Sequence, residues 1–379
     1  MGLTLSDEQL ILKQTARSFL KERSPVSRMR ALRDSEDEVG FSRELWKEMA
    51  GMGWTGIIFP EEFGGAGMAH GELGTLLEEC GRVLAPEPFV STLLLGGNAI
   101  LLGGSESMKR ALLPAVCGGD RFLSLAFQEQ GRFSPYAVST RAVRDGDGYR
   151  IEGQKQFVLD AHVADPLIVV ARTSENPGDR AGLTLFVVDA GLRGVSVRRS
   201  RLLDGRNAAD VTFEGTLVPG ERILGEVDAG GDLLDAVFDR AAIGLSAEML
   251  GTFDEAFERT LAYLKEREQF GVKIGTFQAL RHRIVDMFCE LELARSVVRD
   301  ALTAVDECRN DLSQMASAAK ARCSDVASLI TKEAIQMHGG IGMTDEEDIG
   351  LFFKRAKAAE LTLGDAHHHR DRYASLRGF

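Results

Sequence analysis

The sequence is poor in cysteine and places none of its cysteines in a spacing typical of a metal site. Its five cysteines are scattered over 379 residues, their number is odd, and no two of them form a Cys-x-x-Cys pair. This pattern argues against disulfides and zinc and favours buried thiols. The five are Cys80, Cys117, Cys289, Cys308 and Cys323.

Long apolar runs and a secretory leader are also missing. No uninterrupted apolar stretch approaches 18 residues, so we expect no membrane span. The N-terminal segment MGLTLSDEQLILKQ has acidic residues near its start and lacks the basic segment followed by an apolar core that is typical of a secretory signal. It therefore predicts a cytoplasmic protein. A formal net charge of −12 disfavours a nucleic-acid partner, although a local basic pocket could still bind phosphate.

What is present fits a sizeable folded protein with more than one core. Hydrophobic residues make up 44% and charged residues 27% of the chain, and its length suggests two or three packed units. The sequence pattern changes twice, from helical to β-rich and back to helical, and no internal repeat appears. We therefore predict an α+β fold with an N-terminal helical domain over residues 1–120, a middle antiparallel β domain over 121–228 and a C-terminal helical domain over 229–379, resembling a four-helix bundle.

Local signals support this order. Ser6 followed by Gln9 is a capping-box pattern, and helical spacing resumes over residues 42–53. In the middle, short β-branched runs are separated by Gly, Asp and Pro, and the turn at residues 145–148 predicts a hairpin. In the last third, apolar residues recur at spacings of 3, 4 and 7, which predicts a long bundle helix: Ile284, Phe288, Leu291, Val298, Leu302 and Val305.

Two motifs in the last third are the most specific features of the sequence. The first is REQFGVKIGTFQ at residues 267–278, and the second is QMHGGIG at residues 336–342. Together with PEEFGG at residues 60–65, EGQK at residues 152–155 and the helical, β, helical order, they resemble the acyl-CoA dehydrogenases over essentially the whole chain. The resemblance implies FAD as cofactor, oxidation of the Cα–Cβ bond of an acyl-CoA, an oligomer, and electron-transfer flavoprotein or another electron acceptor.

The chemistry of the two motifs fits a dinucleotide. A pyrophosphate needs a fixed cation, amide donors and close backbone approach, which an Arg, glutamines and a Gly-Gly pair supply. In the resembled family, the two motifs face one FAD from neighbouring subunits. The alternative is structural: Arg267 pairs with a surface carboxylate, Phe270 is core and the glycines only end a helix. The candidates for FAD binding are Arg267, Gln269, Phe270, Gln278, Gln336, Gly339 and Gly340.

The β domain departs from the family pattern beside the flavin. Residues 127–129 read Phe-Gln-Glu where the family has Thr-Glu-Pro, and residues 157–159 read Phe-Val-Leu where it has Trp-Ile-Thr. Phe157 is a candidate wall for the flavin or an ordinary core residue, and Gln128 is a further cofactor candidate. Leu159 has no hydroxyl with which to bind flavin N5.

The expected catalytic base is missing from both positions that the family uses. Alignment on KRAK at residues 354–357 places Leu363 where most members have Glu, and the isovaleryl-type alternative falls on Ala241. A carboxylate in an apolar pocket would suit the base, because burial raises its pKa. We expect Asp365 in that role, with an N-cap or a ribityl contact as its alternative. The remaining carboxylates considered are Asp239 and Glu360.

The ending LTLGDAHHHR places three histidines in a row, at residues 367–369. His367 occupies a position that often touches FAD in the family, whereas a helix cannot turn all three rings to one side, so a metal site is not expected. This ending most resembles the branch of the pimeloyl-CoA dehydrogenase small subunit and of actinobacterial steroid-type enzymes. Two main hypotheses follow: a homo-oligomeric flavoenzyme using Asp365, or a non-catalytic, FAD-contacting subunit in a heterotetramer with a second dehydrogenase chain. An oxidase or nitroalkane-oxidase-like reaction is a third.

Overall fold

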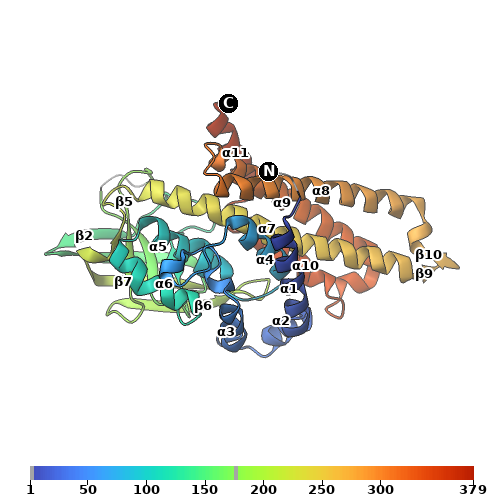
Figure 1. Ribbon diagram of the computed structural model, residues 1–379, viewed down its shortest axis with the longest axis horizontal. Helices are drawn as coiled ribbons and strands as arrows, with labels where there is room; N and C mark the ends of the chain where they lie inside the picture. The colour runs from blue at the N-terminus through green and yellow to red at the C-terminus, as the bar shows by residue number, and fades with distance from the viewer. Residues whose placement is uncertain (1–3, 175–177) are drawn as a thin grey trace. The chain divides into compact units, whose positions relative to one another are not determined.

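The structure is a computed structural model that describes residues 4–174 and 178–379. These residues form two compact units. Unit 1 combines residues 4–31, 70–85 and 242–379, and unit 2 combines residues 32–69 and 86–241, without the undescribed residues 175–177. Helices stand at both ends of the chain with the sheet between them, which confirms the predicted fold class (Figure 1).

Unit 1 is helical apart from one small hairpin. Its longest helices run beside each other, and the hairpin β9–β10 stands between α7 and α8 in the chain (Figure 1). The elements are α1 (Asp7–Arg23), the start of α2 (Val26–Asp34), α4 (His70–Arg82), most of α7 (Gly230–Glu266), β9 (Glu268–Gln269), β10 (Val272–Lys273), α8 (Gln278–Asp306), α9 (Leu312–His338), α10 (Ile349–Leu361) and α11 (Ala366–Arg377).

Two sequence signals in this unit can be checked directly. Ser6 caps α1 with the reciprocal Ser6 and Gln9 bonds of a capping box, as predicted. In α8 the predicted stripe is buried only in its second half, from Leu291 onward. Phe288 is 49% exposed and Val285 is 56% exposed, so the first half of the helix keeps apolar side chains on the surface of the single chain.

A close helix crossing fixes α4 against α7. A Cβ atom added at Gly81 would lie 2.0 Å from the carbonyl oxygen of Glu248, and one added at Gly251 would lie 1.7 Å from that of Glu78. Real Cβ atoms do not approach other atoms so closely, so the two backbones can touch only because both positions are glycine.

Unit 2 contains the sheet and a small helical part. The helices are α3 (Arg43–Gly51), α5 (Asn98–Gly103) and α6 (Glu106–Cys117), and residues Val90–Gly97 form a π-helix. The strands are β1 (Ser124–Ala126), β2 (Arg141–Asp145), β3 (Gly148–Leu159), β4 (Leu167–Arg172), β5 (Leu183–Val188), β6 (Val195–Arg201), β7 (Asn207–Pro219) and β8 (Ile223–Leu224).

The sheet is mainly antiparallel, as predicted, but it is mixed. Its strand order is β6-β7-β3-β2-β4-β5-β8, and β1 pairs with β4. The predicted hairpin joins β2 to β3, with Asp145 opposite Gly148. Two contacts are parallel: β1 with β4, and the single pair between Arg141 of β2 and Arg172 of β4. Strands β4 and β5 are buried along their whole length, so the core of unit 2 lies around them.

Within the described residues, every helix is too short or too polar to cross a membrane.

Candidate functional site

The first motif forms a tight, exposed hairpin at the end of α7. Arg267 follows the helix, Gln269 and Val272 pair across the β9–β10 turn, and Phe270 sits in the turn with φ +56°. Phe270 is 91% exposed, so it is not a core residue of this chain. Positive φ is unfavourable for a bulky residue, and such strain is concentrated at binding sites.

The second motif lies at the same end of the helical unit. The ring of His338 stacks on Tyr263 near the end of α7, with centroids 4.4 Å apart, and the Tyr263 hydroxyl donates to the His338 carbonyl oxygen. The chain then turns through Gly339 and Gly340, where an added Cβ would meet no other atom within 4 Å. Tyr263 and His338 therefore bring the hairpin and the Gly-Gly turn to one end of the bundle.

The polar side chains of these motifs have the properties that a dinucleotide phosphate requires. Arg267, Gln278 and Gln336 are exposed, and within the described chain none of their side chains has a hydrogen bond or ion pair. Gln269 donates only to the neighbouring carbonyl of Glu268. A surface arginine without an ion pair in the described chain, amide donors and an open Gly-Gly turn can together hold a diphosphate. The residues present therefore fit the FAD expected from the sequence.

The loop after α10 has an unusual and well-defined conformation. Leu363 is 4% exposed and adopts φ +61°, and Gly364 follows with φ +96°. Lys320 of α9 donates to the carbonyl oxygens of Glu360 and Gly364 at 3.0 and 2.8 Å. From α11, Nε2 of His369 lies 2.9 Å from the Leu363 carbonyl oxygen. Lys320 and His369, both buried, thus hold a strained turn at the position that the sequence predicts for the usual base.

Asp365 is the N-cap of α11. Its Oδ1 accepts the backbone N–H of His368 at 2.9 Å, which satisfies one free amide of the first turn. This amide bond, together with the nearby His367, lowers the pKa of Asp365 below its usual value. The carboxylate is half-buried and ionised at neutral pH, whereas an ideal general base in an apolar pocket has a raised pKa.

The other two carboxylates considered from the sequence already have interactions within the chain. Glu360 pairs with Lys357 at 2.6 Å, one turn earlier on α10. Asp239 of α7 is buried and interacts with other groups of the chain. Ala241, which the sequence places at the alternative base position, is fully buried.

The three consecutive histidines have three different environments. His367 is exposed, His368 is half-buried, and His369 is buried with its ring edge-on to that of His368. Burial lowers the pKa of His369 to about 3, so its imidazole is neutral. No group of three or more potential metal ligands occurs among residues 4–174 and 178–379.

In unit 2, Phe157 lies at an irregularity in β3. The pairing of β3 with β7 shifts register between Lys155 and Val158, and Phe157 adopts φ +52° with 50% of its side chain exposed. A bulge re-aims a side chain, and bulges are frequent next to active sites. This exposure contradicts the core alternative for Phe157 within the chain. Leu159, at the end of the same strand, is half-buried.

Gln128 and its neighbours are organised by a buried ion pair. The Lys155 ammonium is fully buried and lies 2.6 Å from Oε1 of Glu129. Glu129 also accepts the amides of Ser139 and Thr140. Burial lowers the pKa of Lys155 to about 8. Gln128 itself bonds only along the chain, through its side-chain amide to the Gln130 carbonyl and through its own carbonyl to the amide of residue 156.

A second buried titratable group follows the same strand. Asp160 adopts φ +53° and accepts a hydrogen bond from Ser91 Oγ at 2.6 Å. Ser91 belongs to the π-helix Val90–Gly97. Burial raises the pKa of Asp160 to about 6, because the charged form has little water and only one hydroxyl donor.

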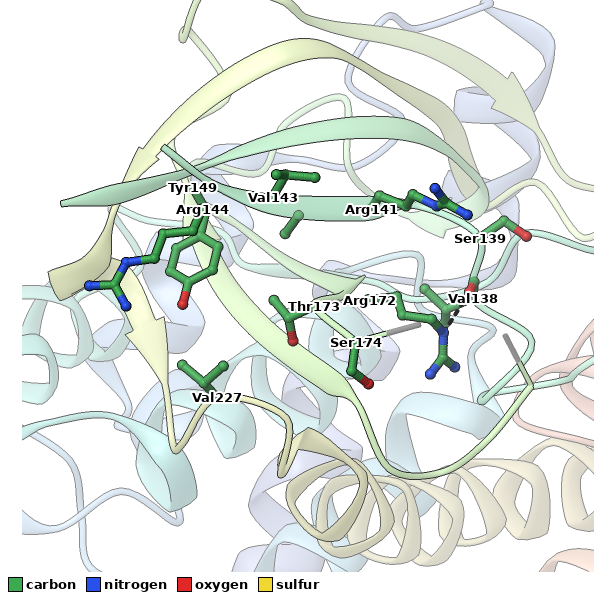
Figure 2. A pocket seen from close by; sticks show the side chains of 11 residues that line it. Val138, Ser139, Arg141, Val143, Arg144, Tyr149, Arg172, Thr173, Ser174 and Val227 are labelled. Atoms are coloured by element: carbon green, nitrogen blue, oxygen red, sulfur yellow. Dashed lines mark hydrogen bonds between the residues drawn. The ribbon is translucent and has the colours of Figure 1, made fainter. Parts of the chain in front are cut away.

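A pocket of about 720 Å³ lies on the sheet beside β2 and β4 (Figure 2). It contains three arginines. Arg141 and Arg144 point in opposite directions, and the guanidinium of Arg172 donates its hydrogen bonds to backbone carbonyl oxygens. None of the site residues predicted from the sequence lines this pocket. It therefore lacks a convergent set of charged groups that could carry the expected chemistry.

Sequence reasoning missed Lys320, Lys155 and Asp160. The sequence contains a signal that Lys320 is buried, because it falls at helical spacing between Ala316 and Cys323. A charged side chain in such an apolar stripe needs hydrogen-bond or ion-pair partners. Lys155 belongs to the EGQK motif at residues 152–155, which by itself does not indicate a buried ion pair.

Comparison with known proteins gives a consistent result along the chain. Three family models match: acyl-CoA dehydrogenase, N-terminal domain, over residues 6–120; middle domain, over residues 127–216; and C-terminal domain, over residues 228–375.

Individual relatives match over almost the full length. The caffeyl-CoA reductase-Etf complex subunit CarC of Acetobacterium woodii is 31% identical, with 92% of each chain covered. The mitochondrial short/branched chain specific acyl-CoA dehydrogenase of Bos taurus is 30% identical, over 96% of this chain and 84% of the relative. Among solved structures, a variant of the Tcur3481-Tcur3483 steroid ACAD superposes with a TM-score of 0.88 at 34% identity and 99% coverage of both chains.

Proposed function

Since this chain belongs to the acyl-CoA dehydrogenase family, whose members are FAD-dependent oxidoreductases, we propose that it takes part in the oxidation of the Cα–Cβ bond of an acyl-CoA thioester. The observation that carries the proposal is the pair of motifs at one end of the helical unit. They present Arg267, Gln278 and Gln336 without partners in their own chain, beside an open Gly-Gly turn.

In this proposal Arg267 and the two glutamines hold the diphosphate of FAD, and Phe270 covers part of the dinucleotide. Phe157, re-aimed by the irregularity in β3, stands against the flavin, and Gln128 and His367 make further contacts. When bound, FAD supplies the acceptor for the hydride that leaves Cβ. Leu159 offers no side-chain hydroxyl to the ring, so any hydrogen bond to the flavin there comes from backbone groups.

The α-proton needs a base, and in a self-sufficient enzyme we propose Asp365. Its carboxylate is ionised at neutral pH and lies two residues after Leu363, beyond a glycine that permits close approach of the chain. Its lowered pKa makes it a weak base in the free protein. A bound acyl chain that excludes water would raise that pKa, because desolvation disfavours the charged form.

Asp365→Asn tests this role, because Asn is as good an N-cap as Asp but cannot accept the proton. We expect the variant to retain FAD and its unfolding temperature, and to slow bleaching of the flavin by a good acyl-CoA by about 100-fold or more. Asp365→Ala is the matched control for the cap and should cost about 1 kcal/mol of stability. Bleaching at the wild-type rate in Asp365→Asn would remove Asp365 from the chemistry.

A second candidate function is that of an FAD-contacting subunit whose partner chain supplies the base. Three features favour it: Leu363 and Ala241 hold the usual base positions, Asp365 is engaged as an N-cap, and Glu360 has an ion pair. The name of the similar steroid ACAD structure joins two designations, Tcur3481 and Tcur3483, and CarC is named as a subunit of a complex with Etf. By analogy, a second dehydrogenase chain and an electron-transfer flavoprotein are the proposed partners.

Association of some kind is supported by the surface of α8. Val285, Phe288 and Leu293 are about half exposed on this helix, which therefore offers apolar surface that another chain can cover. We expect a dimer or tetramer by light scattering, formed either by copies of this chain or with the second chain. If the isolated chain is inert with every acyl-CoA and becomes active when a second dehydrogenase chain is added, the subunit hypothesis holds. Activity of the isolated chain would refute it.

A further inference from the structure

Lys320 is a fully buried lysine that has no carboxylate at hydrogen-bond distance among the described residues. Its three donors reach the carbonyl oxygens of Gly364 at 2.8 Å and Glu360 at 3.0 Å, and the hydroxyl of Ser324 at 3.4 Å. A buried ammonium is costly unless its partners are well placed, so three neutral oxygens are an unusual solution. Neither the sequence motifs nor the family resemblance gave this residue a role.

The two closest partners both belong to the segment that leads into the strained turn. The Glu360 carbonyl lies in the last turn of α10, where carbonyls lack helical partners, and Gly364 lies in the turn itself. On the other side, His369 contacts the Leu363 carbonyl through Nε2, and its Nδ1 has no partner in the described chain. Because Nε2 faces a carbonyl oxygen, it carries the proton and donates it.

The turn needs such support because its backbone is unfavourable by itself. Leu363 at φ +61° costs of order 1 kcal/mol relative to an ordinary conformation, and it persists only when its surroundings hold it. Charge-assisted hydrogen bonds to carbonyls are roughly twice as strong as neutral ones. The ammonium is therefore the strongest single restraint on this segment.

We propose that Lys320 is a positioning residue that holds residues 361–365 in the conformation needed for acyl-CoA oxidation, through its bonds to the Glu360 and Gly364 carbonyls. This inference rests on the proposed function for its catalytic part. It applies whether the turn carries the base at Asp365 or only shapes the site with Leu363.

The charge state of Lys320 gives the positioning a measurable signature. Burial lowers the pKa of Lys320 to about 7, against the opposing effect of its charged neighbours. The titratable groups that face it are Cys323 on α9, Glu360 on α10, Asp365 at the turn, and His368 and His369 on α11. Above that pH the amine loses one donor and its charge, so the turn should be held less tightly at pH 8.5 than at pH 6.

Hydrogen exchange followed by mass spectrometry measures the restraint without using activity. In Lys320→Met, a residue of similar length with no donor, we expect the amides of residues 361–369 to exchange about tenfold faster or more, because two buried carbonyls lose their partner. Thr331→Val is the matched control: it removes a buried hydroxyl of the same helix that bonds only within it, to Ala327. Exchange over residues 361–369 should be unchanged in the control.

A pH series and a second variant separate positioning from general stability. Corrected for intrinsic rates, wild-type exchange over residues 361–369 should rise several-fold between pH 6 and pH 8.5, and Lys320→Met should show no such dependence. Lys320→Gln keeps two donors and should fall between the two. If Lys320→Met does not fold, the wild-type pH series and Lys320→Gln decide the question.

Flavin bleaching by acyl-CoA then tests the link to the reaction. We expect bleaching about tenfold slower or more in Lys320→Met at unchanged FAD content, with the rate partly restored in Lys320→Gln. Faster exchange with unchanged bleaching would overturn the proposal, and so would unchanged exchange. If the wild-type chain is bleached by no acyl-CoA, either alone or after a second dehydrogenase chain is added, the proposed function fails, and the exchange experiment alone decides whether Lys320 holds the turn.

Discussion

Replacing Glu129 with glutamine should expose the cost of the buried Lys155 charge. The ammonium is fully buried and lies 2.6 Å from Glu129 Oε1; its one other hydrogen bond within residues 4–174 and 178–379 is to the Phe127 carbonyl oxygen at 3.3 Å. The same carboxylate accepts the amides of residues 139 and 140. Glutamine keeps the shape of glutamate, but its side-chain NH2 group is a donor. One of the three donors, which are the Lys155 ammonium and the amides of residues 139 and 140, therefore loses its acceptor.

The magnitude follows from the burial. Removing one partner of a buried ion pair typically costs 3–5 kcal/mol, and glutamine retains one acceptor, so we expect Glu129→Gln to lower the free energy of unfolding by about 3 kcal/mol. The pKa of Lys155 is already lowered to about 8 by burial. Without the carboxylate, which raises the pKa of Lys155, that pKa should fall further.

The pH dependence has a definite sign. The unfolded chain keeps its lysine proton up to about pH 10.4, whereas the folded protein releases it at about 8, so stability rises with pH between these values. In Glu129→Gln this rise should begin at lower pH and be larger in total, while its slope stays limited by the release of one proton. Urea unfolding at pH 6, 7.5 and 9 measures it.

The double variant with Lys155→Met supplies the control. Removing both charges should recover part of the lost stability, because no unpaired ammonium remains. A Glu129→Gln protein as stable as wild type at pH 6 would refute the view that Lys155 is charged and dependent on Glu129.

Three further predictions concern other parts of the chain. The wild-type free energy of unfolding should fall by about 2 kcal/mol between pH 4 and 7 through Asp160, because the folded protein, with a pKa of about 6 for this group, keeps a proton that the unfolded chain loses; urea unfolding of Asp160→Asn should lack this fall. Leu159→Thr should alter the flavin absorbance, whereas Leu217→Thr, an exposed position on β7, should not. Gly251→Ala should lower the melting temperature sharply because of its contact with the Glu78 carbonyl, whereas Gly350→Ala, in open space on α10, should not.

The parts of the fold that the sequence predicted depend on local signals. The capping box at Ser6, the turn at residues 145–148 and the β-branched strands each follow from a few neighbouring residues, and the structure confirms them. The parallel pairing of β1 with β4 joins residues that are far apart in sequence, so no local pattern indicates it. The predicted apolar stripe does lie on a helix, α8, but its first half is exposed in the single chain. The spacing of apolar residues shows which face of a helix is apolar and not what covers that face.

The same distinction holds for the candidate site. Motifs indicated Arg267 and Gln336, and the structure leaves their side chains exposed and without partners in the described chain. The N-cap of Asp365 could be foreseen because it needs only the following turn of helix. Lys320 could not be assigned, because its partners at residues 360 and 364 lie some 40 positions away on another element. Asp365 as base remains a prediction.

The most direct test of the central claim is the flavin spectrum of the purified chain during anaerobic addition of acyl-CoAs. The panel should include straight, branched, dicarboxylic, aryl and steroid side-chain thioesters. We predict a yellow protein that carries FAD and is bleached by at least one of them, alone or after a second dehydrogenase chain is added. Protein that cannot bind FAD in either setting, or bound flavin that no acyl-CoA bleaches in either setting, would contradict the account.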